Sequence, residues 1–504
     1  MTEQKAEAKV EAVGEQELLS LDEAAAALGV SRSSFSRWLT QGKIRGMKVG
    51  RQWRFQRSDL DKFVKMAHPS AAGVNVNELD DVIAQLSQEL PGNGKIEIAP
   101  AAEGYPGTEE EEAIERLLSV LLATAIKARA SDLHIEATRE GTCVRRRVDG
   151  VLHEMLRLPS SAHGALVACI KSHSGVAVDQ TQLPQDGRFS AKLGNGREGD
   201  IRASFVPGLH GETVTMRFFE AGTPYIRDLA TLGMKSEDIG VFVGALKKPS
   251  GLIILTGPSG SGKTTTIYAG LRELISPEKK TLTVEDPVEY ILPWTTQIPV
   301  NRKAGLTFAS GLRACMRQDP DILMVGAIRD FEVLEASVNA ALTGHIVLST
   351  VYTNDAPTVI TRLVDMGLDP FLAACLTCIV AQRLVRLVCK NCAEPDQPDI
   401  SALLDLAQRA RAGGYELPKE PTFMRGKGCP SCRNTGYAGR TALYEVMEMT
   451  PEIQELIVKR VPLSELREAV VAGGTITLAA EGLRKAAEGL TTVVEVMRVL
   501  PFRE

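Results

Sequence analysis

The spacing of apolar residues changes several times along the chain and predicts segments of different structure. Between residues 114 and 126, isoleucine, leucine and alanine recur every three or four positions, which predicts a helix that opens a domain. A shorter amphipathic helix is predicted within residues 79–90. From about Asp228, short apolar runs alternate with helical patterns, which indicates a parallel sheet with helical crossovers.

Stretches rich in proline and glycine divide this pattern further, and the predicted fold class is α/β with several domains. The expected segments are a compact module at 18–65, a linker at 66–112, an α+β domain at 113–225, a domain of alternating strands and helices at 226–388, a tetracysteine subdomain at 389–440 and a C-terminal helical subdomain at 441–504.

The composition of the chain is that of a globular protein with several domains. The chain has 504 residues, more than a single core usually holds, with 44% hydrophobic and 24% charged residues. No run of eighteen apolar residues occurs, so we expect no membrane-spanning helix. The first residues, MTEQKAEAKVEAVGEQE, lack the apolar core of a signal peptide. We therefore expect a cytoplasmic protein whose nine cysteines are reduced.

The strongest chemical signal is a glycine-rich loop between an apolar strand at 252–255 and a helical stretch at 265–275. Its glycines let successive N–H groups face phosphates, Lys263 neutralises the β- and γ-phosphates, and Thr264 can ligate Mg²⁺. The sequence therefore predicts a site for ATP and Mg²⁺ in a P-loop (RecA-like) domain at 226–388. The expected binding residues are Gly257, Pro258, Ser259, Gly260, Ser261, Gly262, Lys263, Thr264 and Thr265.

Two acidic segments follow this loop. Thr283-Val-Glu285-Asp286-Pro287 is predicted to end one strand, and Asp319-Pro-Asp321 precedes another that runs to Gly326. Carboxylates at strand ends beside a phosphate loop suit water activation and metal binding. Either segment alone would more often cap a helix or end a strand, but their combination with the loop favours catalysis.

Four ordered motifs carry a family resemblance: GPSGSGKTTT, TVEDPVEY, RQDPDILMVGAIRD and TGHIVLSTVYTNDA. They resemble the boxes of GspE/PilB-type ATPases, the motors of type II secretion and type IV pilus assembly. Upstream, SDLHIEA, RRRVDGVLHEM, LPQDGRF and IRASFVPGLHGETVTMRF resemble the preceding domain of the same family. The resemblance covers residues from about 113 to 500.

The resemblance implies a homohexameric ring at the cytoplasmic face of the inner membrane, with platform and assembly proteins of a secretion or pilus system as partners. It also implies arginines that reach the nucleotide site of the same or a neighbouring subunit. The catalytic residues that it implies are Glu285, which would position the attacking water, and His345, Arg147, Arg188 and Arg202, with Arg217 as a further candidate.

Two positions depart from the family pattern. Ala327 stands where the Walker B box has a glutamate, and Tyr352 stands where the family usually has a histidine near the γ-phosphate. A methyl group can neither order metal-bound water nor accept a proton. Three outcomes stay open: slow hydrolysis through Glu285, nucleotide binding without turnover, or rescue by an acid such as Asp286 or Asp330. The alternative to a slow motor is a regulatory or structural subunit.

Two CxxC pairs predict a structural zinc site, because each pair can present two thiolates to one tetrahedral metal. Four protein ligands leave no open position for chemistry. The family carries a similar inserted tetracysteine subdomain. A third pair, Cys375 and Cys378, is interpreted as core residues of a helical stretch at 371–388. The expected zinc ligands are Cys389, Cys392, Cys429 and Cys432.

Residues 18–65 predict a winged helix-turn-helix. Ser20-Leu-Asp-Glu23 forms a capping box before a first helix, a second helix is expected at 31–41, and alternating apolar residues around Gly50 predict a hairpin. The segment resembles excisionase or MerR-type modules. Eight basic residues and no acidic residue lie between Arg32 and Arg57, which suits phosphate contacts. DNA is one expected partner, and an acidic protein or anionic lipid at a docking site is the other.

Overall fold

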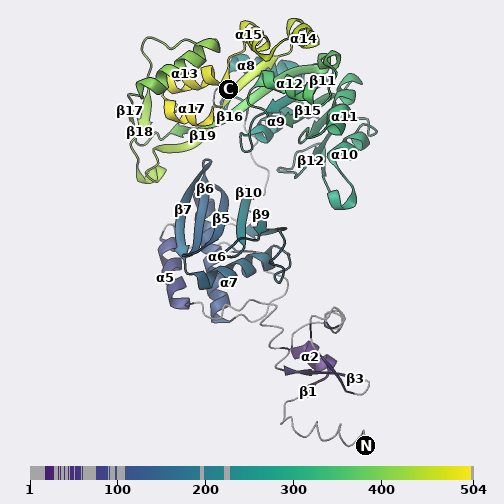
Figure 1. The fold of residues 1–504 in the computed structure, drawn as a ribbon, viewed down its shortest axis with the longest axis vertical. Helices are drawn as coiled ribbons and strands as arrows, with labels where there is room; N and C mark the ends of the chain where they lie inside the picture. Colours follow the sequence, from purple (N-terminus) through teal and green to yellow (C-terminus); the bar gives the residue numbers. More distant parts are fainter. Residues whose placement is uncertain are drawn as a thin grey trace, which may run out of the picture. The chain divides into compact units, whose positions relative to one another are not determined.

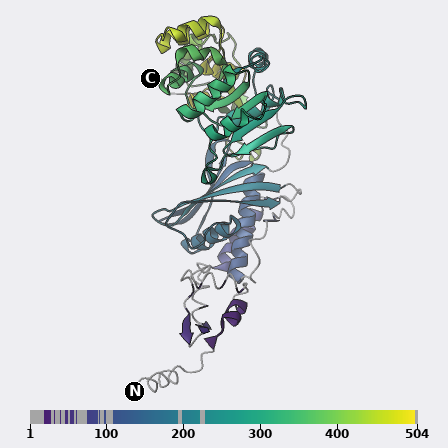
Figure 2. The same ribbon diagram turned by 90° about the vertical axis from the view of Figure 1, so that its right-hand side faces the viewer.

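The computed structural model describes most of the chain, and Figure 1 and Figure 2 show it in two views. The described residues are 18–27, 32, 35, 39, 44, 46–49, 52–57, 60, 75–88, 90, 97–98, 108–192, 198–220 and 228–500. The chain divides into two compact units, Met1–Gly222 and Thr223–Glu504, and each is described by itself.

The first unit begins with a small module whose described residues include helix α2 (Leu21–Ala27) and a three-stranded antiparallel sheet. The strand order is β1-β3-β2, with β1 (Leu18–Leu19), β2 (Met47–Val49) and β3 (Gln52–Gln56). The pairing of β2 with β3 confirms the predicted hairpin. Most of the second helix predicted at 31–41 lies outside the described residues.

Helix α2 (Leu21–Ala27) of this module starts at the predicted capping box. The Glu23 N–H donates to Ser20 Oγ at 3.3 Å, and the Ser20 N–H donates to Glu23 Oε2 at 2.8 Å. Phe35 and Phe55 meet edge to face in the core, with ring centroids 4.9 Å apart. The two hydrogen bonds confirm the capping box, and Ala24 and Ala25 of α2 share the apolar core with Phe55 of β3.

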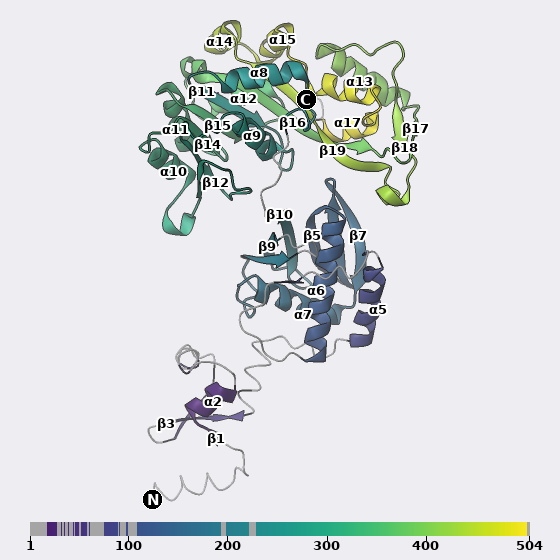
Figure 3. The same ribbon diagram turned by 180° about the vertical axis from the view of Figure 1, so that it is seen from behind.

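The rest of the first unit is an α+β arrangement around a seven-stranded antiparallel sheet of order β4-β8-β9-β10-β5-β6-β7. Helices α6 and α7 pack against the same face of the sheet, and α5 packs against α6 (Figure 3). Both predicted amphipathic helices, α5 and α6, are confirmed. The bounds are α5 (Val76–Ser87), β4 (Glu97–Ile98), α6 (Glu109–Lys127), β5 (Ala130–Thr138), β6 (Gly141–Val148), β7 (Val151–Leu158), α7 (Ser160–His173), β8 (Gln185–Lys192), β9 (Glu198–Val206) and β10 (Thr213–Glu220).

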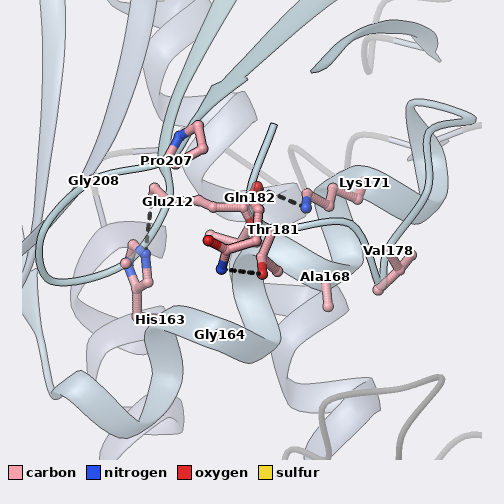
Figure 4. A pocket seen from close by; sticks show the side chains of 12 residues that line it. His163, Gly164, Ala168, Lys171, Val178, Thr181, Gln182, Pro207, Gly208 and Glu212 are labelled. Carbon is pink, nitrogen blue, oxygen red and sulfur yellow. Dashed lines mark hydrogen bonds and ion pairs between the residues drawn. The ribbon is translucent and has the colours of Figure 1, made fainter. Parts of the chain in front are cut away.

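A buried ion pair joins α7 to the loop between β9 and β10. Lys171 Nζ lies 2.7 Å from Glu212 Oε1 and donates to the Gln180 carbonyl oxygen at 2.8 Å. His163 Nε2 lies 2.8 Å from the Glu212 carbonyl oxygen, and burial lowers the pKa of His163. These side chains line a hollow of about 320 Å³ beside α7 (Figure 4). The loop is therefore held by polar contacts that are shielded from water.

The second unit contains a seven-stranded sheet of order β13-β12-β14-β15-β11-β16-β19, parallel except for the antiparallel pair β16 and β19. Ile253 and Leu255 of β11 pack with α8 and α9 on one face, and Leu252 and Ile254 pack with α10, α11 and α12 on the other. The strands are β11 (Gly251–Thr256), β12 (Thr281–Glu285), β13 (Thr295–Pro299), β14 (Ile322–Val325), β15 (Ile346–Val351), β16 (Leu376–Val388), β17 (Ala393–Pro395), β18 (Met424–Gly426) and β19 (Tyr437–Glu448).

The helices of this unit confirm the predicted alternation of strands and helices after Asp228. The C-terminal helices share one apolar core with the sheet. The bounds are α8 (Ser236–Leu246), α9 (Lys263–Arg272), α10 (Phe308–Cys315), α11 (Phe331–Leu342), α12 (Ala356–Asp365), α13 (Ile400–Ala412), α14 (Pro451–Val458), α15 (Leu463–Ala472), α16 (Leu478–Ala487) and α17 (Val493–Val499), with short 3₁₀ turns η1 (Arg302–Ala304), η2 (Pro370–Cys375) and η3 (Pro430–Cys432).

One predicted element is wrong. Residues 371–388 were expected to be helical, but they form the turn η2 and the long strand β16, which pairs with β11. The interior of this strand is buried on both faces, so its apolar run shows no alternation and cannot be distinguished from a buried helix by periodicity. Cys375 and Cys378 are buried core residues as predicted. Strand β19 crosses the expected division at residue 440.

We expect Lys171→Met to destabilise the first unit, because the Glu212 carboxylate would remain buried without its cation. The expected loss is about 3–5 kcal/mol in the free energy of local opening. Hydrogen exchange of α7 peptides in the full chain measures this loss. Lys192→Met, at an exposed position, is the matched control and should change stability by less than about 0.5 kcal/mol. Equal protection of α7 in the two variants would contradict the prediction.

Candidate nucleotide-binding site

The phosphate loop connects the end of β11 to the start of α9. All six residues of β11 are buried. Gly257 and Gly262 have positive φ values of 144° and 90°, and a Cβ at these positions would lie 2.4 Å from the Gln382 carbonyl oxygen and 2.8 Å from Gln382 Nε2, respectively. Only glycine therefore fits at both positions. The predicted strand-loop-helix context of residues 257–265 is confirmed.

Two polar side chains of the loop, Lys263 and Ser261, are candidates to contact a phosphate. Lys263 Nζ donates to the carbonyl oxygens of Gly257 and Pro258, both at 2.8 Å. Within the described part of the chain, the buried Ser261 hydroxyl has no hydrogen-bond partner. Burial, and then the charge of Arg383, lowers the pKa of Lys263 to about 8. An ammonium ion and an unsatisfied hydroxyl fit a polyphosphate bound with Mg²⁺.

Tyr352, one of the two departures from the family pattern, belongs to this site. It follows β15, and its ring centroid lies 4.6 Å from Lys263 Nζ in a cation–π contact. Tyr352 is 55% exposed, so its ring contacts Lys263 while part of the residue faces solvent. The adjacent Thr353 hydroxyl lies 2.8 Å from Thr256 Oγ1 at the end of β11.

Two residues of β16 support the loop and were not predicted. Arg383 is buried and donates from Nη2 to the Asn354 carbonyl oxygen at 2.8 Å. Gln382 Oε1 accepts a hydrogen bond from Thr266 Oγ1 on α9 at 3.0 Å. Neither residue was predicted, because a helix expected over residues 371–388 hides the pairing of this segment with β11. The signal available in the sequence was a pair of polar residues, Gln382 and Arg383, inside an apolar run.

Glu285 ends β12 and is only 2% exposed. Its carboxylate accepts hydrogen bonds from Thr283 Oγ1 at 2.5 Å, from Gln297 Nε2 at 3.0 Å and from the Tyr268 hydroxyl. Burial, and then the Glu285 charge, raises the pKa of Tyr268 well above its usual range. Both carboxylate oxygens are thus held by neutral donors, and a bound water would have to compete with these donors for Glu285.

Ala327 has no carboxylate, and the two acids expected as possible substitutes for it already have partners in the fold. Ala327 is 3% exposed and follows β14. Asp330 caps α11 by accepting from the Val333 N–H at 3.0 Å. Asp286 Oδ2 lies 3.5 Å from Arg302 Nη2. Of the two acids considered as substitutes for the Walker B glutamate, Asp330 has a structural task and Asp286 has a cationic partner.

The expectation for His345 needs correction. His345 precedes β15, and its carbonyl oxygen accepts from the N–H of Gly251 at the start of β11. The phosphate loop follows the opposite end of these two parallel strands, which at ~3.3 Å per residue places His345 roughly 20 Å away. His345 therefore cannot approach a phosphate on the P-loop of its own chain.

The predicted arginines lie in the first unit and form a single row across its sheet. Arg188, Arg202, Arg217, Asp132 and Arg147 are direct cross-strand partners on β8, β9, β10, β5 and β6. The Asp132 carboxylate accepts from Arg217 Nε at 2.8 Å and lies 3.8 Å from Arg147 Nε. Sequence reasoning missed Asp132, which orients two of the four arginines.

The four predicted zinc ligands are brought together between the ends of β16 and β19. Their sulfur atoms all lie within 4.8 Å of one another, with 3.9 Å from Cys389 to Cys429, 3.8 Å from Cys392 to Cys432 and 3.6 Å from Cys429 to Cys432. A tetrahedral zinc ion with bonds of ~2.3 Å separates its sulfur ligands by about 3.8 Å. The cluster therefore fits one zinc ion.

A phosphate loop at the carboxyl end of β11, inside a parallel sheet covered by helices on both faces, defines a P-loop NTPase of the RecA-like class. The family model for type II/IV secretion system proteins matches residues 107–498, and a helix-turn-helix domain model matches residues 18–67. The chain belongs to the type II/IV secretion system protein family, which confirms the resemblance seen in the motifs.

Named relatives agree with this assignment. The type II secretion system ATPase E of Vibrio cholerae is 41% identical over 83% of this chain and 80% of its own length. The type IV pilus assembly ATPase PilB of Myxococcus xanthus is 38% identical over 88% of this chain and 75% of its own length. The fold is shared with the ATPase DotB of Legionella pneumophila, at a TM-score of 0.53, 20% identity, and coverage of 80% of this chain and 98% of that one. Among the described residues, none forms a helix long and apolar enough to cross a membrane.

The lowered pKa of Lys263 predicts that nucleotide affinity depends on pH. Only the ammonium form brings positive charge to the phosphates, and bound phosphate raises its pKa. Affinity should therefore fall as the pH rises through about 8, by up to about tenfold per pH unit. Titration with a fluorescent ATP analogue over a pH series measures this. Lys263→Arg, whose guanidinium does not titrate, should bind with a flat profile. Parallel profiles for the two proteins would contradict the prediction.

Proposed function

We propose that this chain is an ATP-binding, ATP-hydrolysing subunit that powers type II secretion or type IV pilus assembly from the cytoplasmic face of the inner membrane. The observation that carries this proposal is the complete phosphate loop with Lys263 at the carboxyl end of β11. Family membership and relatives named as secretion and pilus ATPases support it. Gly257–Thr265 hold ATP, and Thr264 ligates Mg²⁺.

The proposed working form is a homohexameric ring that acts on membrane platform and assembly proteins. In it, the arginine row of the first unit supplies charge-stabilising groups to a nucleotide of the same or a neighbouring subunit. The cross-strand alignment of Arg188, Arg202, Arg217 and Arg147 supports this role, because it presents four guanidinium groups along one line. We also propose that the chain is organised in the six segments expected from the sequence, which begin at residues 18, 66, 113, 226, 389 and 441.

Hydrolysis is proposed to be slow. Ala327 provides no carboxylate, and Glu285 must share its oxygens among Tyr268, Thr283 and Gln297. A missing acid–base group typically lowers the rate about a hundredfold or more. The same two observations favour a second candidate function, in which the chain binds ATP without turnover and regulates another, intact ATPase.

We propose that the four-cysteine cluster holds a structural Zn²⁺ between the ends of β16 and β19. The sulfur separations support this proposal, because they match those expected around a tetrahedral zinc. All four coordination positions are then occupied by protein, so this ion contributes stability and takes no part in hydrolysis.

Phosphate release by the purified full chain with Mg²⁺ and ATP tests the hydrolytic proposal. We expect slow release that Lys263→Ala abolishes. Ala327→Glu should raise turnover by about a hundredfold, because it restores a carboxylate beside the phosphates. Ala327→Gln is the matched control, since it adds the same volume without a charge.

The outcomes separate the two candidate functions. ATP binding without release in the parent chain would establish the regulatory alternative. Release that Ala327→Glu and Ala327→Gln change equally, in folded proteins of equal ATP affinity, would show that the missing carboxylate does not limit the rate.

The N-terminal module is proposed to bind an anionic partner, with duplex DNA as one candidate and an acidic protein surface as the other. The helix-turn-helix match and the basic segment Arg32–Arg57 support both. A mobility shift of duplex DNA by the full chain should weaken with salt and with Lys48→Glu on the exposed hairpin, but not with Lys419→Glu, an exposed lysine in the second unit. No shift at low salt would reject DNA and leave the protein partner.

A further inference from the structure

Three metal-binding side chains of different chemistry meet between α6 and α7, outside the sites described above. Glu115 lies on α6, and Cys169 and His173 lie four residues apart on one face of α7. Their ligand atoms all lie within 4.8 Å of one another. His173 Nε2 is 2.8 Å from Glu115 Oε1 and 3.0 Å from Glu115 Oε2. Two helices thus bring a thiol, an imidazole and a carboxylate to one point.

This donor set matches the preference of zinc. Zn²⁺ binds sulfur at ~2.3 Å, imidazole nitrogen at ~2.0–2.1 Å and carboxylate oxygen at ~2.0–2.2 Å, so its tetrahedral ligand atoms lie about 3.3–3.6 Å apart. Ligand atoms that lie within 4.8 Å of one another would have to approach by at most about 1.5 Å to reach those separations. The His173 side chain is 4% exposed and the Glu115 side chain is 48% exposed, so the point lies at the edge of the core with access from solvent.

We propose that Glu115, Cys169 and His173 bind a Zn²⁺ ion that joins α6 to α7. The Cys169 thiol releases its proton to solvent as the sulfur–zinc bond forms, and the Nε2 proton that His173 donates to Glu115 is released or moves to Nδ1, so that the Nε2 lone pair forms the second bond. A Glu115 oxygen forms the third, which replaces its hydrogen bond to His173. Water occupies the fourth position, so the ion exchanges more readily than one held by four cysteines.

The position of α7 gives such an ion a structural consequence. Cys169 and His173 face α6, whereas Lys171 and His163 of the same helix line the hollow of Figure 4 and hold the loop at 207–212. Zinc would fix α7 from its other side. The first unit should therefore be more stable with zinc than without it. In the absence of a metal, the helices are joined by their shared apolar core and by the hydrogen bonds between Glu115 and His173.

Zinc content of the purified full chain, measured by mass spectrometry after equilibration with Zn²⁺ and gel filtration, tests the proposal. We expect two zinc ions per chain in the parent protein and one in Cys169→Ser and in Glu115→Gln. Cys143→Ser on β6 and Glu112→Gln, an exposed glutamate of α6, are the matched controls and should keep two. Glu115→Gln decides the question if Cys169→Ser does not fold, because Glu115 lies at the surface.

Cobalt substitution provides a second readout. The difference spectrum between the parent and Cys169→Ser should show the sulfur-to-cobalt charge-transfer band of a single thiolate, together with tetrahedral ligand-field bands. Added zinc should also raise the melting temperature of the parent more than that of Glu115→Gln. The proposal would be overturned if the parent and Glu115→Gln each held one zinc ion per chain, or if the difference spectrum lacked a charge-transfer band. Glu115 and His173 would then form a metal-free hydrogen bond between the helices.

Discussion

A phosphate loop needs free backbone N–H groups at the end of a buried strand, and the second unit is arranged around this requirement. Strand β11 is buried along its whole length between β15 and β16, so the chain leaves the sheet only at its carboxyl edge. There, Gly257 and Gly262 turn beneath atoms of Gln382 that leave no room for a side chain. The loop, α9 and β16 therefore depend on one another, and a change in any of them alters the space for phosphate.

The charged groups around this loop are held by dipoles. Lys263 and Arg383 donate to backbone carbonyl oxygens, and the Glu285 carboxylate accepts from hydroxyl and amide groups. Charges in such surroundings gain strongly from an oppositely charged ligand, because burial has already removed their water. The residues expected to hold phosphate are therefore all present, whereas Ala327 provides no carboxylate that could position the attacking water. ATP binding and ATP hydrolysis therefore depend on different groups in this chain.

Helix α7 carries most of the unusual chemistry of the first unit. One of its faces buries Lys171 against Glu212, and another places Cys169 and His173 beside α6. The sheet that it covers presents the arginine row, whose geometry depends on Asp132. Buried polar groups of this kind cost stability unless each is paired, so they define the positions of α7 and of the strands more sharply than apolar contacts alone.

Short stretches of sequence were enough to predict the phosphate loop, the capping box at Ser20 and the helices α5 and α6. They were also enough to predict that the four cysteines of the two CxxC pairs lie together. Each of these signals is local, because it depends on turn geometry, helical periodicity or ligand spacing. Strand β16 was mistaken for a helix, since burial on both faces removes the alternation that marks a strand. The same sequence box contains His345 and Tyr352, and only the direction of β15 shows that Tyr352 alone lies at the phosphate loop. The sequence by itself therefore determined the chemical class of the protein. Tertiary structure alone decided which distant residues support or occupy the site, because strand order and register bring together side chains that are more than a hundred positions apart, such as Thr266 and Gln382.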